Sequence, residues 1–127
     1  MEDMYMMGGF IYKMFPVLRT IQHCASHCEH MGKMFLHSPD VYARTTQIDL
    51  LRDCADICDS TARYIARNSM FSKSLAKKCA RICETCGTYC LQFPDEASQL
   101  CARVCLHCAA ECRAFVMGVG SADPNWE

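Results

Sequence analysis

The sequence predicts an all-α protein that folds as an antiparallel up-down-up-down four-helix bundle. Two observations predict it. Apolar and cysteine residues recur at the four-three spacing of one helical face in four separate stretches, and only a few residues connect each stretch to the next. Short connections force sequential helices to lie antiparallel. At 127 residues, the chain is long enough for one domain with a core of its own.

The first helix is expected from Pro16 to Leu36, because proline suits the first helical turn. Its inward face is formed by residues at helical spacing: Val17, Ile21, Cys24, Cys28, Met31 and Phe35. Residues 1–15 are expected to form a methionine-rich tail. Besides Met1, the methionines of this tail are Met4, Met6, Met7 and Met14. Thioethers are soft ligands that suit copper(I), so one interpretation is that the tail guides ions to an end of the bundle. The simpler interpretation is a flexible segment or a contact between subunits.

The second helix is expected from Pro39 to Arg67, with Ser38 as its N-cap and Pro39 in its first turn. Its inward face carries two cysteines among larger residues: Gln47, Leu51, Cys54, Cys58, Thr61 and Ile65. Asn68-Ser69 is expected to end this helix.

The third helix is expected from Ser72, as its cap, to about Gln92. The fourth is expected to open at Pro94-Asp95-Glu96, with acidic residues where the helix dipole favours them, and to end near Met117-Gly118. Each has an inward face centred on four cysteines: Cys79, Cys83, Cys86 and Cys90, then Cys101, Cys105, Cys108 and Cys112. The bundle domain is thus predicted over residues 16–117, with a C-terminal tail over 118–127.

The twelve cysteines are the candidate functional residues. The antiparallel order places those of the first two helices, Cys24, Cys28, Cys54 and Cys58, near the middle of a column of thiols that the last two helices extend toward both ends. Met31 and Phe35 occupy positions where the same register would place further cysteines, so they are expected to close one end, with Leu51 and Phe93. The other end of the column is expected to be closed by Met14, Val17, Ile65 and Phe115. Ions are expected to enter at one end.

Neither packing nor disulfide formation explains this pattern well. Cysteine is a small hydrophobe that gives up the volume of leucine, so four in succession along one face are poor filler. Residues four apart on a helix have Cβ atoms about 5–6 Å apart, whereas a disulfide needs about 3.8 Å. Bridges within a helix are therefore excluded. Bridges between helices remain possible, although a reducing cytoplasm disfavours them.

Metal binding is the remaining interpretation, and charge favours copper(I). Thiolates select copper(I), zinc and iron–sulfur clusters. Zinc in a four-thiolate site leaves two net negative charges, which are costly in a buried column, and no Lys or Arg falls on the cysteine faces. Copper(I) carries one charge and tolerates bridging thiolates, so several ions can bring the column toward neutrality. A zinc or iron–sulfur binding protein and a thiol redox protein stay as alternatives.

Composition narrows the other possibilities. A formal net charge of -1 argues against nucleic acid as the main partner, and no stretch is long and apolar enough for a membrane span. The acidic start Met1-Glu2-Asp3 lacks the positive charge of a secretion signal, so a cytoplasmic location is expected. No nucleophile with a placed base or phosphate-binding loop is present, so an enzyme is not expected.

The arrangement from about His23 to Phe115 closely resembles the bacterial copper storage proteins, a family of cysteine-lined four-helix bundles. The residues that carry the resemblance are Asp53-Cys54-Ala55-Asp56-Ile57-Cys58, Cys79 to Cys90, and Cys101 to Cys112 with Arg113. The resemblance implies many copper(I) ions held by thiolates in the core, often a homo-tetramer, and cytosolic storage. A copper chaperone or an efflux protein is a possible exchange partner. The family often has more cysteines on the first helix, so a lower capacity is expected here.

Histidine adds one further candidate ligand. His27 flanks the cysteine face of the first helix and is the favoured histidine ligand, followed by His37 near the mouth of the bundle. His23 and His30 fall off that face, and His107 is expected at the surface.

Overall fold

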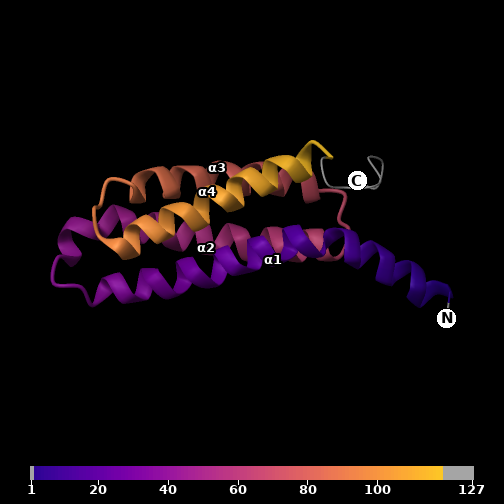
Figure 1. The fold of residues 1–127 in the computed structure, drawn as a ribbon, viewed down its shortest axis with the longest axis horizontal. Helices are drawn as coiled ribbons and strands as arrows, with labels where there is room; N and C mark the ends of the chain where they lie inside the picture. Colours follow the sequence, from indigo (N-terminus) through magenta and orange to yellow (C-terminus); the bar gives the residue numbers. More distant parts are fainter. Residues whose placement is uncertain (1, 119–127) are drawn as a thin grey trace.

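The structure, a computed structural model, describes residues 2–118, with side chains from Pro16 onward. Four α-helices and one short 3-10 helix follow one another (Figure 1). Their bounds are α1 Glu2–Leu36, η1 Val41–Arg44, α2 Thr45–Ala66, α3 Ser72–Cys90 and α4 Glu96–Val116. This all-helical architecture confirms the predicted fold class. Within the described part of the chain, no helix combines the length and apolar character needed to cross a bilayer.

Successive helices run in opposite directions along the bundle. The α1–α2 and α3–α4 connections lie at one end and the α2–α3 connection at the other (Figure 1). The closest packing is between α1 and α2 and between α3 and α4, whereas α1 and α4 pack together less extensively. Gly87 helps α3 approach α4, because a Cβ atom there would lie 2.8 Å from Leu106 Cγ.

Helix α1 is longer than the sequence predicts. It begins at Glu2 and carries Pro16 in its interior, so the expected start at Pro16 is wrong. Proline favours a first turn but does not forbid a preceding one, because it removes only one backbone donor. The side chains of residues 2–15 lie outside the described residues, as does everything after Gly118, so the domain boundaries and the role of the N-terminal methionines stay predictions.

Helix α2 begins later than predicted. Ser38 and Pro39 do not start it; a 3-10 turn over Val41–Arg44 comes first, and the α-helix begins at Thr45. Ser38 Oγ donates a hydrogen bond to the carboxylate of Asp40 and not to a helix terminus. The same carboxylate accepts from Arg44 Nε at 2.9 Å. This turn directs Arg44 into the bundle. A straight helix that began at Pro39 would not need such a turn.

The remaining helix ends follow the predicted signals, except at the two ends of α3. Asn68, in the left-handed region at φ 53°, follows the end of α2, and the Asp95 side chain caps α4 by accepting from the Ser98 N–H. Ser72 does begin α3, but its hydroxyl is not a cap. It donates to the carbonyl oxygens of Tyr64 and Ser69 at 3.1 and 2.7 Å and so fastens the α2–α3 connection. Helix α3 ends at Cys90, not Gln92.

Candidate metal centre

All twelve cysteine side chains lie in the core as free thiols, each with a relative exposure of 0%. They come from all four α-helices: Cys24 and Cys28 from α1, Cys54 and Cys58 from α2, Cys79, Cys83, Cys86 and Cys90 from α3, and Cys101, Cys105, Cys108 and Cys112 from α4. The four-three spacing therefore places thiols on four inward faces, as the sequence predicts. Helical periodicity alone accounts for this burial.

Most of the sulfur atoms gather into three compact groups, within each of which the Sγ atoms all lie within 4.8 Å of one another. The groups are Cys24–Cys58–Cys83–Cys108, Cys24–Cys28–Cys54–Cys105 and Cys79–Cys108–Cys112. Cys24 belongs to two groups, and so does Cys108. The groups are therefore not separate sites but overlapping parts of one column.

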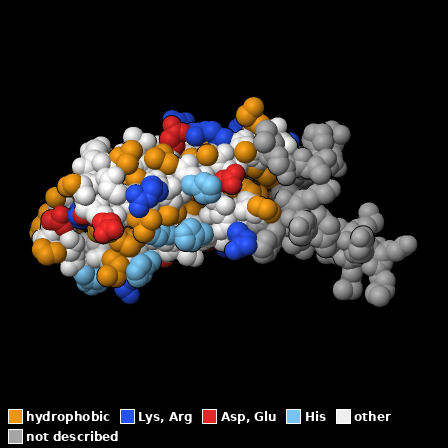
Figure 2. All heavy atoms as spheres, in the orientation of Figure 1, with side chains coloured by type: hydrophobic (Ala, Val, Ile, Leu, Met, Phe, Trp, Pro, Cys, Tyr) orange, Lys and Arg blue, Asp and Glu red, His pale blue; other side chains and the backbone are white. Residues whose placement is uncertain are grey.

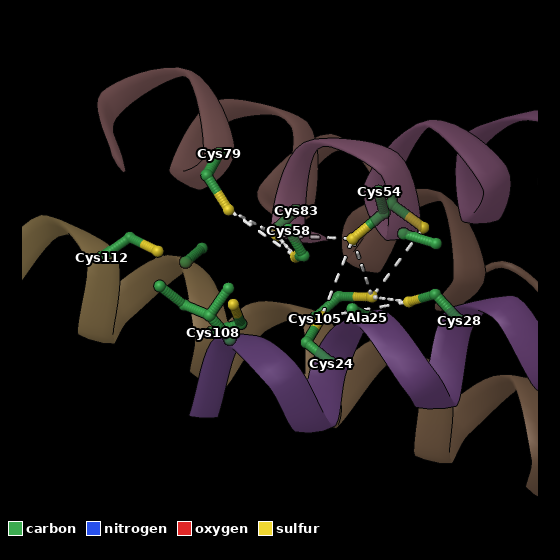
Figure 3. Close-up of a cluster of buried hydrophobic side chains, with 14 of the residues drawn as sticks. Cys24, Ala25, Cys28, Cys54, Cys58, Cys79, Cys83, Cys105, Cys108 and Cys112 are labelled. Atoms are coloured by element: carbon green, nitrogen blue, oxygen red, sulfur yellow. Dashed lines mark hydrogen bonds between the residues drawn. The ribbon is translucent and has the colours of Figure 1, made fainter. Parts of the chain in front are cut away.

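The closest sulfur pairs join different helices. Cys28 Sγ lies 3.4 Å from Cys105 Sγ, and Cys54 Sγ lies 3.4 Å from Cys83 Sγ. Thiols four apart on one helix, such as Cys24 and Cys28, are 3.9 Å apart. A disulfide bond is about 2.0 Å long, so these are contacts between thiols and not bonds. Figure 3 shows the sulfur atoms pointing toward one another in the bundle interior.

Several of the deep thiols, among them Cys54 and Cys108, have a raised pKa and so favour the protonated form. The neighbouring Cys112 thiol, other nearby thiols and burial together raise the pKa of Cys108, and Cys105 acts first among the same causes to raise the pKa of Cys54. A buried thiolate without a compensating cation is unfavourable in a low-dielectric core. A soft cation that enters the column would therefore displace protons from it.

Three cysteines, Cys86, Cys90 and Cys101, fall outside the compact groups and lie toward the α3–α4 connection. Of these three, Cys86 lies nearest the column, with its Sγ 3.9 Å from Cys105 Sγ. Cys101 Sγ lies 3.5 Å from Nε2 of the half-buried His27. A hydrogen bond with Cys90, followed by His27, lowers the pKa of Cys101 to about 6 against the effect of burial. Cys101 in turn raises the pKa of His27, so each group of this pair favours the charged form of the other.

A buried arginine closes this end of the column. Arg44 is only 7% exposed, and its guanidinium lies between the rings of Phe35 and Phe93, at 4.5 and 4.8 Å from their centroids. It donates hydrogen bonds to Asp95 Oδ1 at 2.9 Å and to Gln47 Oε1 at 2.9 Å. We call this set, together with Asp40 and Ser98, the polar end. It gives each of the three guanidinium nitrogens of Arg44 at least one hydrogen-bond partner.

Gln47 connects the polar end to the thiols. Its amide Nε2 donates to Ser98 Oγ at 2.9 Å and reaches Cys90 Sγ at 3.5 Å. Helical spacing predicted Gln47 on the inward face but assigned it no role. Arg44 was missed altogether, because it precedes α2 and lies off the periodic pattern; an arginine three residues before an inward-facing glutamine was the available signal.

Apolar residues close the opposite end. Ile65 is fully buried, and Phe115 and Leu18 are nearly so. Val17 packs against them as a partly buried residue. This set, the apolar end, agrees with the predicted closure except for Met14, whose side chain lies outside the described residues.

The other histidines do not reach the thiol column. His23, His30, His37 and His107 are exposed, and the ring of His23 lies 6.1 Å from that of His27, centroid to centroid. The structure thus brings His27 to a cysteine and leaves His37, the second predicted histidine, at the surface.

Comparison with known proteins relates this arrangement to one family. A family model described as copper storage protein matches residues 12–117. An uncharacterized cysteine-rich protein of Bacillus subtilis, YhjQ, is 36% identical over 67 residues, which are 53% of this chain. The matched region spans 62% of the length of that relative.

Solved structures show the same fold. The Cu(I)-bound copper storage protein BsCsp3, known also in its apo form from Bacillus subtilis, is 31% identical with a TM-score of 0.78 over 82% of this chain and 98% of that one. A cytosolic copper storage protein from Streptomyces lividans, loaded with five coppers, is 26% identical with a TM-score of 0.80 over 87% and 98% of the two chains.

Proposed function

Because this chain belongs to the copper storage protein family, we propose that it stores copper(I) in the cytosol, holding several ions among the thiols of its core. One observation carries the proposal. The compact groups of sulfur atoms share Cys24 and Cys108, so ions in neighbouring groups would share ligands along one column. A storage protein needs many equivalent sites in a small volume, and bridging thiolates provide them.

The chemistry of the column favours copper(I) over harder or more highly charged ions. Thiolates are soft ligands that select copper(I). Each monovalent ion can replace one thiol proton, so filling the column need not build up net charge in the core. His27 and the twelve cysteines are the proposed ligands. We do not propose a catalytic acid–base pair, because copper storage requires no catalytic site.

The proposal is tested by anaerobic titration of the reduced apoprotein with copper(I) in the presence of a strong chromogenic copper(I) chelator. We expect several ions per chain to be withdrawn from the chelator, with release of protons to the buffer. Binding of only one or two ions would contradict storage.

Two double variants remove the same number of thiols from different places. Cys24→Ser/Cys108→Ser removes both cysteines shared between groups, whereas Cys90→Ser/Cys112→Ser removes one from near each end. We expect the first variant to lose more ions than the second. Equal losses would contradict the shared-ligand column, and circular dichroism would verify that both variants remain helical.

Zinc is the second candidate cargo, because two of the groups contain four sulfur atoms, the number that zinc takes in structural sites. The charge argument opposes it, since each such site would leave two buried negative charges. Competition between zinc and copper(I), followed by metal analysis of the protein, decides between them. Retention of zinc against one equivalent of copper(I) per thiol would overturn the choice of copper.

We also propose that the chain forms a homo-oligomer. Large apolar side chains are exposed at both ends of the bundle: Leu36, Tyr42, Leu91 and Leu100 at one, and Met70, Phe71 and Met117 at the other. Burial of these side chains between copies would be favourable. Sedimentation velocity across a concentration range measures the state, and a monomer at all concentrations would contradict it.

A further inference from the structure

The side chain of Gln47 is a buried polar group that copper storage does not by itself explain. It projects from α2 into the core at the polar end and has a relative exposure of 0%. On the face drawn in Figure 2, hydrophobic and charged side chains together form the surface of this end, at the left. Gln47 lies beneath such a surface, so water does not compete for its hydrogen bonds. An amide in this environment is costly unless its groups have partners.

The partners of Gln47 determine which way its amide faces. Arg44 Nη1 lies 2.9 Å from one of the terminal atoms of Gln47, and a guanidinium can only donate, so that atom is the amide oxygen. On the other side lies Ser98 Oγ at 2.9 Å, which gives its own proton to the carboxylate of Asp95. The oxygen of Ser98 must therefore accept, and the group that faces it is the amide Nε2. The neighbours thus fix the orientation of the amide.

One N–H of this amide remains for Cys90. Nε2 carries two protons, of which Ser98 takes one, and Cys90 Sγ lies 3.5 Å from the same nitrogen. An amide nitrogen can only donate, so this contact favours the thiolate of Cys90 over the thiol. Arg44 donates to the oxygen of the same amide, which polarises the amide and strengthens its N–H groups as donors.

This nitrogen donor distinguishes Cys90 from the thiols of the compact groups, which have other sulfur atoms as neighbours. The nearby thiols of Cys101 and Cys86, together with burial, raise the pKa of Cys90, and the amide of Gln47 opposes them. The amide is therefore already placed to stabilise the negative charge that remains on Cys90 when a soft cation displaces its proton.

We propose that Gln47 is a positioning residue for copper(I) at Cys90, where its N–H···S hydrogen bond holds the sulfur as a thiolate ligand. The proposal rests on the proposed storage function and adds a residue beyond the metal ligands themselves. The copper–sulfur bond forms as the S–H bond breaks and its proton leaves to the buffer, while copper stays copper(I). Arg44, Ser98 and Asp95 act through Gln47, because they fix its orientation. The polar end would thus serve ion binding as well as stability.

The side-chain amide protons of Gln47 report on this hydrogen bond directly. Copper(I) is diamagnetic, so proton–nitrogen correlation spectra of the isotope-labelled protein stay sharp on anaerobic loading, and the Gln47 signal is assigned by its loss in Gln47→Leu. We expect one N–H of Gln47 to move to lower field, because a thiolate is a stronger acceptor than a thiol. The movement should be absent in Cys90→Ala, and the exposed Gln92 is the internal reference. An unmoved Gln47 signal in a protein that has bound several ions would overturn the proposal.

Substitutions of Gln47 separate positioning from packing. Gln47→Glu keeps the shape of the side chain and its contact with Arg44, but it presents to Cys90 a carboxylate oxygen that repels a thiolate. Gln47→Leu removes the amide without adding charge. Gln92→Glu, at an exposed position, is the matched control. Each variant is titrated with copper(I) against a strong chelator, with and without Cys90→Ala, and the urea midpoint of its reduced apoprotein is measured.

We expect Gln47→Glu to weaken the binding of one ion about tenfold or more, and Gln47→Leu to weaken it less. Gln92→Glu should bind copper(I) like the wild type. In the Cys90→Ala background, neither substitution of Gln47 should weaken binding further. A merely structural role would instead lower the urea midpoint and weaken binding equally with and without Cys90, and that result, or no weakening at all, would overturn the positioning role but not storage. Failure of the wild-type protein to bind several ions would overturn storage.

Discussion

The two ends of the thiol column are closed by different kinds of interaction. The polar end holds one buried cation, Arg44, in a set of directional hydrogen bonds that includes Asp95 and Gln47. The apolar end is filled by Ile65 and Phe115, which contribute through burial and contact alone. A buried charge is tolerated only while its partners remain complete, whereas an apolar plug accepts changes of shape. The first end should therefore be the more sensitive to single substitutions.

Loss of the buried cation should have the largest effect on stability. Arg44→Met leaves Gln47 and Asp95 without their donor, and we expect the free energy of unfolding to fall by about 4 kcal/mol. Urea unfolding of the reduced apoprotein measures it. Arg67→Met is the control, because Arg67 is exposed and only stacks on Tyr64. Equal losses in the two variants would show that the network at the polar end adds nothing.

Truncation at the apolar end should come next. Ile65→Ala leaves a cavity in the apolar end, and we expect a loss of about 3 kcal/mol in the free energy of unfolding. The same urea experiment applies, with Ile57→Ala as a partly buried comparison that should cost less. A loss larger than that of Arg44→Met would reverse the ranking of the two ends.

Acid should weaken the polar end selectively. Although partial burial alone would raise it, hydrogen bonds from Arg44 and Ser98 hold the pKa of Asp95 below its ordinary value. Its contribution is therefore complete above the pKa of the unfolded chain and is lost as the pH falls through the lower, folded pKa.

We expect Asp95→Asn to cost about 1 kcal/mol at neutral pH and to lose stability less steeply on acidification. Urea midpoints between neutral pH and about pH 3 provide the measurement. Ile65→Ala should keep the wild-type pH dependence, since it leaves the polar end intact, and Asp59→Asn, at an exposed position, is the charge-matched control. An unchanged acid slope in Asp95→Asn would contradict the assignment.

An exposed ion pair away from both ends should matter least. Arg113 of α4 pairs with Glu84 of α3, and both side chains are about half exposed. Glu84→Gln should lower the free energy of unfolding by about 0.5 kcal/mol at low salt, and high salt should abolish the difference, because solvent screens the pair. The urea midpoints of wild type and variant, measured at both salt concentrations, test this. A loss as large as that of Asp95→Asn would mean that burial is not what distinguishes the polar end.

Much of the candidate site could be predicted because it is periodic. The recurrence of Cys79, Cys83, Cys86 and Cys90 at four-three spacing defines one face of a helix, and that face must be buried in a bundle. Asp95 before a helical stretch is similarly local, because an N-cap binds a backbone N–H only three residues away. Such features depend on neighbours in sequence and need no knowledge of the fold.

The remaining features depend on contacts between distant residues. Nothing near Arg44 in the sequence shows that it meets Asp95, 51 residues away, or that a 3-10 turn directs it inward. The start of α1 was also missed, because the signal of Pro16 is a preference and not a prohibition.

The sequence by itself determined that this protein is a bundle with thiols along its inner faces, because helical period and hydrophobic burial together leave no other place for them. The tertiary structure alone decided which thiols meet and that Cys24 and Cys108 each join two groups. It also decided that an arginine closes one end, and that His27 contacts Cys101 where α1 and α4 pack more loosely. Periodicity specifies the direction in which a side chain points, but only the relative height and rotation of packed helices specify its partner across the core.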